Sequence, residues 1–126
     1  MLLGLLILFA CGSDSATYND FNHISHWDDL DQLEGEKTII YYYSPFCDIC
    51  INLEPSVSSS LKELEEHFEI FLIDTGEIYE QGTPDFEYRE TVPALIIFEN
   101  QEFQEWIIGS TPVTNYLEEQ LNKINK

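Results

Sequence analysis

The sequence predicts an α/β fold in which helices flank a central mixed β-sheet, with a β-hairpin and a helix at the C-terminal end. Runs rich in β-branched and aromatic residues alternate with stretches whose apolar residues recur every three or four positions. The best-defined strand runs are apolar throughout, which is typical of strands covered on both faces. Alternating strands and helices followed by a terminal hairpin imply this mixed sheet between helices.

The first predicted elements precede the cysteine-containing region. A short first strand is expected at 21–24, and Ser25 is a suitable N-cap for a helix over 26–34. The early aspartates of that helix lie near the positive end of its dipole, and Gly35 is expected to end it. The apolar run 38–43 is predicted to be a buried strand in the centre of the sheet.

The longest predicted helix begins at Cys47. Its apolar residues follow one another at steps of three and four: Cys50, Leu53, Val57, Leu61, Leu64 and Phe68. Pro55 lies inside this helix and is expected to kink it, because proline has no backbone donor. A second buried strand is predicted over 68–74, and residues 75–90 are expected to form a loop with an irregular helix around 85–90.

The C-terminal part is predicted to be a hairpin followed by a helix. Strands over 93–99 and 102–108 are joined by the tight turn Asn100–Gln101. Gly109 ends the second strand, and Thr111–Pro112 has the residues of a helix start. The apolar stripe of this last helix consists of Val113, Tyr116, Leu117, Leu121 and Ile124.

Length and composition indicate one globular domain with an acidic surface. The chain has 126 residues, near the commonest domain size, and 44% of them are hydrophobic, so a core forms without several disulfides. The formal net charge is −19, from 24 acidic against five basic residues. Such a surface repels phosphate backbones and anionic lipid heads, which argues against nucleic-acid binding. The charge is interpreted as a solvated acidic coat, although it would also suit a basic partner.

The N-terminal stretch is predicted to be an export signal. Residues 1–10 form an apolar run that is too short to span a bilayer but fits the core of a signal peptide. The run Leu8–Cys11 resembles the cleavage site of a bacterial lipoprotein, where cleavage before Cys11 leaves its thiol to carry a lipid. Residues 11–20 are then expected to be a linker and 21–126 the folded domain. The alternative is a buried N-terminal strand with an idle Cys11.

Two of the three cysteines, Cys47 and Cys50, have the spacing of a redox site. Residues three apart share one face of a helix, and their Cα atoms lie about 5 Å apart, within the range that a disulfide requires. Cys47 falls at the helix start, where free N–H groups and the dipole favour a thiolate, and Cys50 lies one turn deeper. This asymmetry suits an attacking thiol followed by a resolving thiol. Half a metal site and two unreactive thiols are the alternatives.

The other chemically functional side chains have structural interpretations. A zinc site needs about four ligands, and the three histidines show no ligand spacing relative to the single cysteine pair. His23 and His26 flank a helix start and are interpreted as surface residues, and His67 is interpreted as the end of a helix. The large aromatic residues are interpreted as core, namely Tyr41, Tyr42, Tyr43, Trp27 and Trp106.

Around the cysteine pair the sequence resembles the thioredoxin superfamily, and the resemblance covers most of residues 21–125. Three features carry it: the CxxC after an apolar strand, Pro55 five residues past the second cysteine, and Thr91-Val92-Pro93 before the hairpin. The resemblance implies a thioredoxin-like fold, a cis peptide bond at Pro93 that packs against the disulfide, and backbone groups of Val92 offered to a substrate peptide. A cis X–Pro bond costs only about 0.5–1 kcal/mol, so tertiary contacts impose it readily.

The sequence departs from thioredoxin itself at the positions that tune the cysteines. Tyr41 stands where the cytoplasmic reductases of the family have a buried acid, six residues before the first cysteine. Phe46 replaces the usual tryptophan, and Asp48 and Ile49 replace the Gly-Pro between the cysteines. The negative charge of Asp48 destabilises the Cys47 thiolate by about as much free energy as the helix N-terminus stabilises it. The direction of electron flow therefore stays open. These departures indicate a specialised member rather than a housekeeping thioredoxin.

The sequence therefore predicts a protein thiol–disulfide oxidoreductase, anchored by a lipid outside the cytoplasmic membrane of a bacterium. Cys47 attacks a substrate disulfide and Cys50 resolves the mixed disulfide, so the pair itself is the reagent, with no metal or organic cofactor. The expected partners are protein thiols or disulfides and an unidentified redox partner, and the domain is expected to be a monomer. The rival hypothesis is a non-catalytic binding module with a fixed disulfide, whose acidic surface holds a basic partner such as a secreted cationic peptide.

Overall fold

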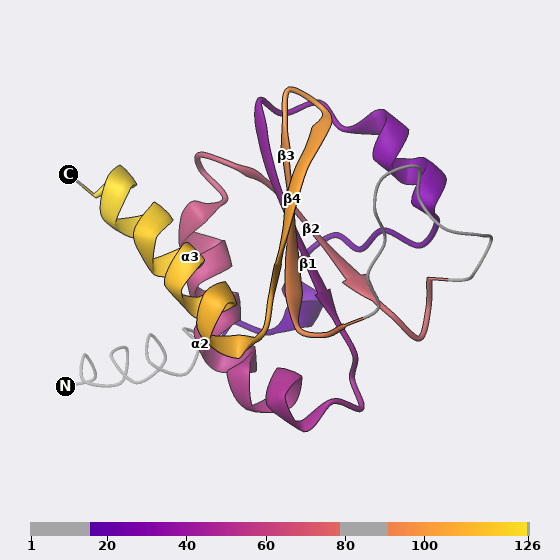
Figure 1. The fold of residues 1–126 in the computed structure, drawn as a ribbon, viewed down its shortest axis with the longest axis vertical. Helices are drawn as coiled ribbons and strands as arrows, with labels where there is room; N and C mark the ends of the chain where they lie inside the picture. The colour runs from indigo at the N-terminus through magenta and orange to yellow at the C-terminus, as the bar shows by residue number, and fades with distance from the viewer. Residues whose placement is uncertain (1–15, 79–90, 126) are drawn as a thin grey trace, which may run out of the picture.

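The computed structural model describes residues 16–78 and 91–125, which form a mixed sheet covered by helices (Figure 1). In Figure 1 the two α-helices lie together on one side of the sheet, and the longer 3-10 helix lies on the other. The described elements are η1 (Tyr18–Asp20), η2 (Trp27–Gln32), β1 (Lys37–Tyr43), α2 (Asp48–Leu64), β2 (Glu69–Asp74), β3 (Ala94–Glu99), β4 (Glu102–Ile108) and α3 (Ser110–Ile124).

The described strands form one sheet with the order β2-β1-β3-β4. β1 pairs in parallel with β2 and antiparallel with β3, so the sheet is mixed, as predicted. β3 and β4 form the antiparallel hairpin. Its turn residues Asn100 and Gln101 have φ angles of 52° and 67°, and positive φ at both positions is the type I′ geometry that suits twisted strands. The fold class and the hairpin turn are therefore confirmed.

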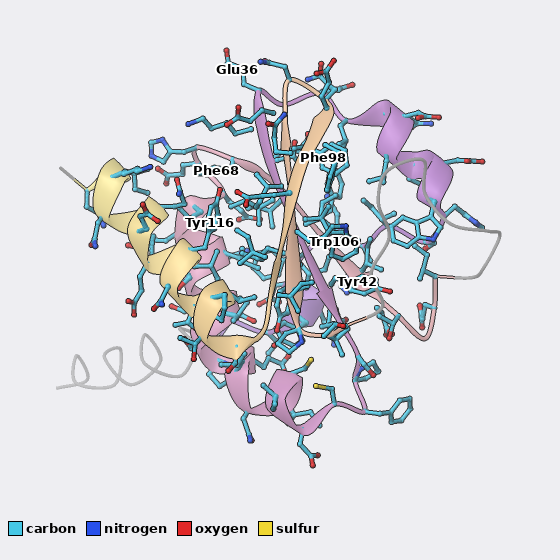
Figure 2. The ribbon with its side chains drawn as sticks, in the orientation of Figure 1. Glu36, Tyr42, Phe68, Phe98, Trp106 and Tyr116 are labelled. Carbon is cyan, nitrogen blue, oxygen red and sulfur yellow. The ribbon has the colours of Figure 1, made fainter. Side chains whose placement is uncertain are left out.

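The central strand β1 supplies side chains to both hydrophobic cores. Every residue from Thr38 to Tyr43 is buried, because successive side chains of a strand point to opposite faces and both faces are covered. Tyr41 and Tyr43 belong to the core beneath α2 and α3, whereas Tyr42 belongs to the core on the η2 side. Figure 2 shows Tyr42 and Trp106 together on that second side of the sheet. The predicted core role of these tyrosines is confirmed.

The N-terminal region differs from the prediction in two places. The predicted linker ends earlier than residue 20, because residues 18–20 form η1 and the Tyr18 side chain is only 5% exposed. The strand expected at 21–24 is reduced to a single parallel bridge between His23 and Leu72. The folded domain thus begins no later than Tyr18, which packs in the core beneath α2.

The helix expected over 26–34 is the 3-10 helix η2, and its N-cap is His26 rather than Ser25. Its apolar residues Trp27 and Leu30 and its C-cap Leu33 recur at steps of three. A 3-10 helix has three residues per turn, so this spacing places Trp27 and Leu30 on one face, and Leu33 packs in the same core on the η2 side. The apolar residues of this stretch recur at steps of three and never of four, and this spacing was the sequence signal for a 3-10 helix.

Some predicted features lie outside the described residues. These are the export signal, Cys11 and the irregular helix expected around 85–90. Within residues 16–78 and 91–125, no helix combines the length and the apolar character needed to cross a membrane.

Gly109 joins β4 to α3 in a backbone conformation that favours glycine. Its φ of 105° and ψ of 157° lie in a region that residues with a Cβ rarely adopt. Its N–H also donates to the Pro93 carbonyl at 2.9 Å, so the same residue helps to fix the start of β3.

Gly109→Ala is expected to lower the free energy of unfolding by about 1–3 kcal/mol, because the alanine Cβ is strained at this φ. Urea denaturation followed by circular dichroism measures the change. Ser110→Ala at the next position is the control. A Gly109→Ala variant as stable as the wild type would contradict the described backbone.

Candidate active site

Cys47 and Cys50 lie where β1 gives way to α2, as predicted. Cys47 is the N-cap of α2, and its sulfur accepts a hydrogen bond from the Cys50 N–H at 3.2 Å. Ser44 shapes the corner before the helix, because its Oγ accepts from the Phe46 N–H at 3.1 Å and its carbonyl accepts from the Cys47 N–H at 3.2 Å. Figure 2 shows the two sulfur atoms, in yellow, at this end of the helix. The structure therefore brings the two cysteines together.

The two thiols differ in their access to solvent. Cys47 is partly exposed, whereas Cys50 is fully buried. Burial is the main cause that raises the pKa of the Cys50 thiol to about 12, and the hydrogen bond with Cys47 adds to the rise. A backbone group of Ser44 lowers the same pKa, but by less. At neutral pH Cys50 is a protonated, shielded thiol, and Cys47 is the sulfur that an outside reagent meets first.

Three exposed apolar residues lie close to Cys47 in the sequence, and Phe46, Ile49 and Ile51 are called the apolar rim here. Phe46 is 88% exposed, and Ile49 and Ile51 are each 50% exposed. Large apolar side chains gathered at the surface are typical of sites that contact other molecules. Of the predicted tuning residues, Phe46, Asp48 and Ile49 are thus exposed, and Tyr41 is buried.

The Val92–Pro93 peptide bond is cis, as the resemblance implied. Pro93 is buried directly before β3, and Val92 is half-buried. Tyr42, near the end of β1, pairs with Ala94 at the start of β3, so Val92 and Pro93 lie at the edge of the sheet from which the chain enters α2. Val92 and Cys47 both pack against the buried cluster that includes Cys50. The predicted substrate-binding pair and the cysteines therefore share one end of the molecule.

Tyr41 lies fully buried in the place where the family has an acid. Its hydroxyl lies 3.0 Å from the Tyr18 hydroxyl, and the Tyr18 hydroxyl donates to the Cys50 carbonyl at 2.6 Å. Burial raises the pKa of both phenols above the ordinary range, so both are neutral hydroxyls at physiological pH. Tyr18 is not predicted from the sequence, because a single aromatic residue in a polar stretch carries no periodic signal.

The histidines have structural contacts. One nitrogen of the His23 ring lies 2.8 Å from the Tyr43 hydroxyl, and the other lies 3.0 Å from the Phe21 carbonyl. His26 caps η2, and His67 is exposed just after α2. In the described part of the chain, no three acidic, histidine or cysteine side chains are grouped closely enough to hold a metal ion.

Asp48 places a negative charge next to Cys47. Asp48→Asn is expected to raise the rate of Cys47 alkylation by iodoacetamide at pH 7 about threefold, because removing a like charge worth roughly 0.6 kcal/mol favours the thiolate. Glu63→Gln, which removes one charge near the other end of α2, is the control. An unchanged or slower rate in Asp48→Asn would remove this charge from the account of the site.

A mixed sheet with a cysteine pair at the start of the following helix, and a cis-proline at the same sheet edge, defines a protein of the thioredoxin-like fold. The family model described as Thioredoxin matches residues 19–123, and the chain belongs to this family. The family is one of thiol–disulfide oxidoreductases.

Individual relatives agree with this assignment. Thioredoxin M-type, chloroplastic, of Brassica napus is 25% identical over 101 residues, which are 80% of this chain and 56% of that protein. This chain therefore spans little more than half the length of that relative. Mitochondrial thioredoxin 3 of Saccharomyces cerevisiae in its oxidized form shares the fold with a TM-score of 0.66 at 17% identity, over 84% of this chain and 97% of the other. Plasmodium falciparum thioredoxin gives a TM-score of 0.64 at 15% identity, over 81% of this chain and 97% of that chain.

Proposed function

We propose that this protein is a thiol–disulfide oxidoreductase that acts on other proteins through Cys47 and Cys50. One observation carries the proposal: an accessible sulfur at a helix N-terminus lies in hydrogen-bond contact with the backbone of a buried cysteine one turn further on. The helix terminus favours the thiolate of the first cysteine, and burial protects the second from outside reagents. Membership of the thioredoxin family supports the same chemistry.

The reductive reaction runs in two exchange steps. The Cys47 thiolate attacks one sulfur of a substrate disulfide, a mixed disulfide forms, and the other substrate sulfur leaves as a thiolate and takes up a proton. Cys50 then loses its proton and attacks the Cys47 sulfur, which closes the Cys47–Cys50 disulfide and releases the second substrate sulfur. Two electrons pass from the pair to the substrate, and the reverse steps oxidise a substrate dithiol. These steps need no metal or organic cofactor.

The substrate peptide is proposed to lie across the apolar rim and the segment before β3. Val92 and Pro93 stand at the same sheet edge as the start of α2, and Val92 offers backbone groups for an extended peptide. The rim residues Phe46 and Ile49 supply apolar contact beside Cys47. Main-chain bonds combined with apolar contact would admit many substrate sequences.

The protein is proposed to work outside the cytoplasmic membrane of a bacterium, tethered through a lipid on Cys11. The support comes from the sequence alone, in the apolar residues 1–10 followed directly by Cys11. The domain is proposed to act as a monomer that an unidentified redox partner recharges. Labelling of the full chain with a radioactive fatty acid tests the tether, and loss of label in Cys11→Ala is the expected result.

Insulin reduction tests the proposed activity. With dithiothreitol as the electron source, the wild type is expected to accelerate precipitation of the insulin B chain over dithiothreitol alone. Cys47→Ser should lose this acceleration, because no accessible sulfur then starts the exchange. An inert wild type whose Cys47–Cys50 bond resists dithiothreitol would contradict the proposal and support the binding module with a fixed disulfide.

A further inference from the structure

Tyr18 reaches from the start of the described chain to the buried side of the cysteine pair. Its backbone N–H donates to Oε2 of Glu54 at 2.9 Å, and its hydroxyl donates to the carbonyl of Cys50 at 2.6 Å. Its ring centroid lies 5.2 Å from that of Tyr41 and 4.5 Å from that of Tyr43. The residue therefore contacts both ends of the helical turn from Cys50 to Glu54 and the strand beneath it.

The direction of the hydrogen bonds follows from the groups involved. A carbonyl oxygen only accepts, so the single hydroxyl proton of Tyr18 is used in the bond to Cys50. The 3.0 Å contact between the two phenols is then a bond that Tyr41 donates to Tyr18. The hydrogen-bond chain therefore runs from the Tyr41 hydroxyl through the Tyr18 hydroxyl to the Cys50 carbonyl. None of these groups is a base.

Pro55 weakens α2 in the helical turn that Tyr18 contacts. Proline has no N–H, and its ring crowds the carbonyl four residues earlier, which is that of Ile51. The α2 helix is therefore weakened in the turn that follows Cys50. The Tyr18 hydroxyl bonds the carbonyl next to Ile51, and Glu54 anchors the Tyr18 backbone from the same turn. The weakened turn is thus held from outside the helix.

We propose that Tyr18 and Tyr41 are positioning residues for Cys50, which hold the first turn of α2 so that the Cys50 sulfur faces Cys47 during resolution of the mixed disulfide. The inference rests on the proposed function. In the step concerned, the Cys50–Cys47 bond forms, the bond from Cys47 to the substrate breaks, and the substrate sulfur leaves with the electron pair. The Cys50 proton passes to water, because neutral buried phenols are not bases. The two hydroxyls act by holding Cys50 in position, and Tyr41 occupies the place where the family has an acid.

Stopped-flow reaction of the reduced full chain with 5,5′-dithiobis(2-nitrobenzoate) separates the two steps, in a Cys11→Ala background so that only Cys47 and Cys50 react. Attack by Cys47 releases the first thionitrobenzoate, and resolution by Cys50 releases the second. Tyr18→Phe keeps the ring and removes the donor, and it is expected to slow the second release about tenfold, the effect of one buried hydrogen bond to the reacting turn. Tyr41→Phe should slow the second release by less, and the first release should be unchanged in both variants.

Tyr43→Phe is the matched control. It removes a hydroxyl from the same strand and the same ring cluster, but that hydroxyl lies 2.8 Å from His23 rather than in the chain that ends at Cys50. Urea denaturation checks that all three variants fold. The proposal predicts that the second release keeps its wild-type rate in Tyr43→Phe. It is overturned if the second release is slowed equally in all three variants, or is slowed in none of them.

The pH profile gives a second readout, which separates a positioning role from a role in proton transfer. If the pair acts by position, Tyr18→Phe lowers the rate of the second release by the same factor at every pH between 6 and 9. A changed pH slope would mean that the phenols take part in proton transfer, and it would overturn the positioning role. A wild type that never gives a second release would instead refute the proposed exchange function itself.

Discussion

A Cys50→Ser variant should hold its protein substrates as long-lived mixed disulfides on Cys47. In the wild type the resolving attack is intramolecular, and a well-placed group of this kind acts at an effective concentration of about 10⁵ M or more. Only outside thiols remain to release the substrate from the variant. The lifetime of the adduct at pH 7 is therefore expected to lengthen by at least about a thousandfold. Non-reducing electrophoresis and mass spectrometry of the captured adducts measure this and identify the substrates.

Cys47→Ser is the matched control for the capture experiment. In a Cys11→Ala background it should give no adducts, because the one remaining cysteine, Cys50, is 0% exposed and a substrate disulfide cannot reach it. Adducts carried on Cys50 would reverse the assignment of the attacking and the resolving thiol.

The rate of resolution should rise with pH throughout the range 6 to 9. The nucleophile is the thiolate, and the pKa of the Cys50 thiol is raised to about 12. Its main cause, burial, persists when Cys47 is bonded to a substrate, so the thiolate fraction stays small and grows about tenfold for each pH unit. The second thionitrobenzoate release is therefore expected to accelerate by about a thousandfold from pH 6 to 9.

Protein unfolded in urea is the control for this pH dependence. Its exposed thiols should behave ordinarily, with a rate that levels off above about pH 8.5. A plateau below pH 8 in the folded protein would contradict the account, because it would require a proton acceptor next to Cys50.

The sequence predicted the elements whose pattern is strong and local. The strand that ends in Tyr43 is rich in β-branched and aromatic residues, and α2 carries a clear apolar stripe, so both lie where expected. The cis bond before Pro93 came from the resemblance alone, because no local preference of the residues specifies it. The asymmetry of the cysteine pair followed from their order at the helix start.

The features that the sequence did not predict depend on contacts between distant residues. Tyr18 was assigned to a linker, but its partners Tyr41, Cys50 and Glu54 lie 23, 32 and 36 positions away. No local sequence pattern predicts such a residue, because its burial requires β1 and α2 to be folded already. The steps of three in η2 were visible, but an acidic stretch with a good N-cap residue suggested an α-helix. Tyr41 was correctly expected in the core, whereas its hydrogen bond to Tyr18 is visible only in the structure.

Redox titration of the full chain is the most direct test of the central claim that Cys47 and Cys50 form a reversible pair. The full chain with Cys11→Ala is equilibrated with graded ratios of reduced to oxidised glutathione and alkylated, and its mass is then measured by mass spectrometry. The account predicts that the whole population passes between the dithiol and the Cys47–Cys50 disulfide in one two-electron transition. A pair that stays locked in one form at every ratio, or that bonds glutathione without ever closing on itself, would contradict it.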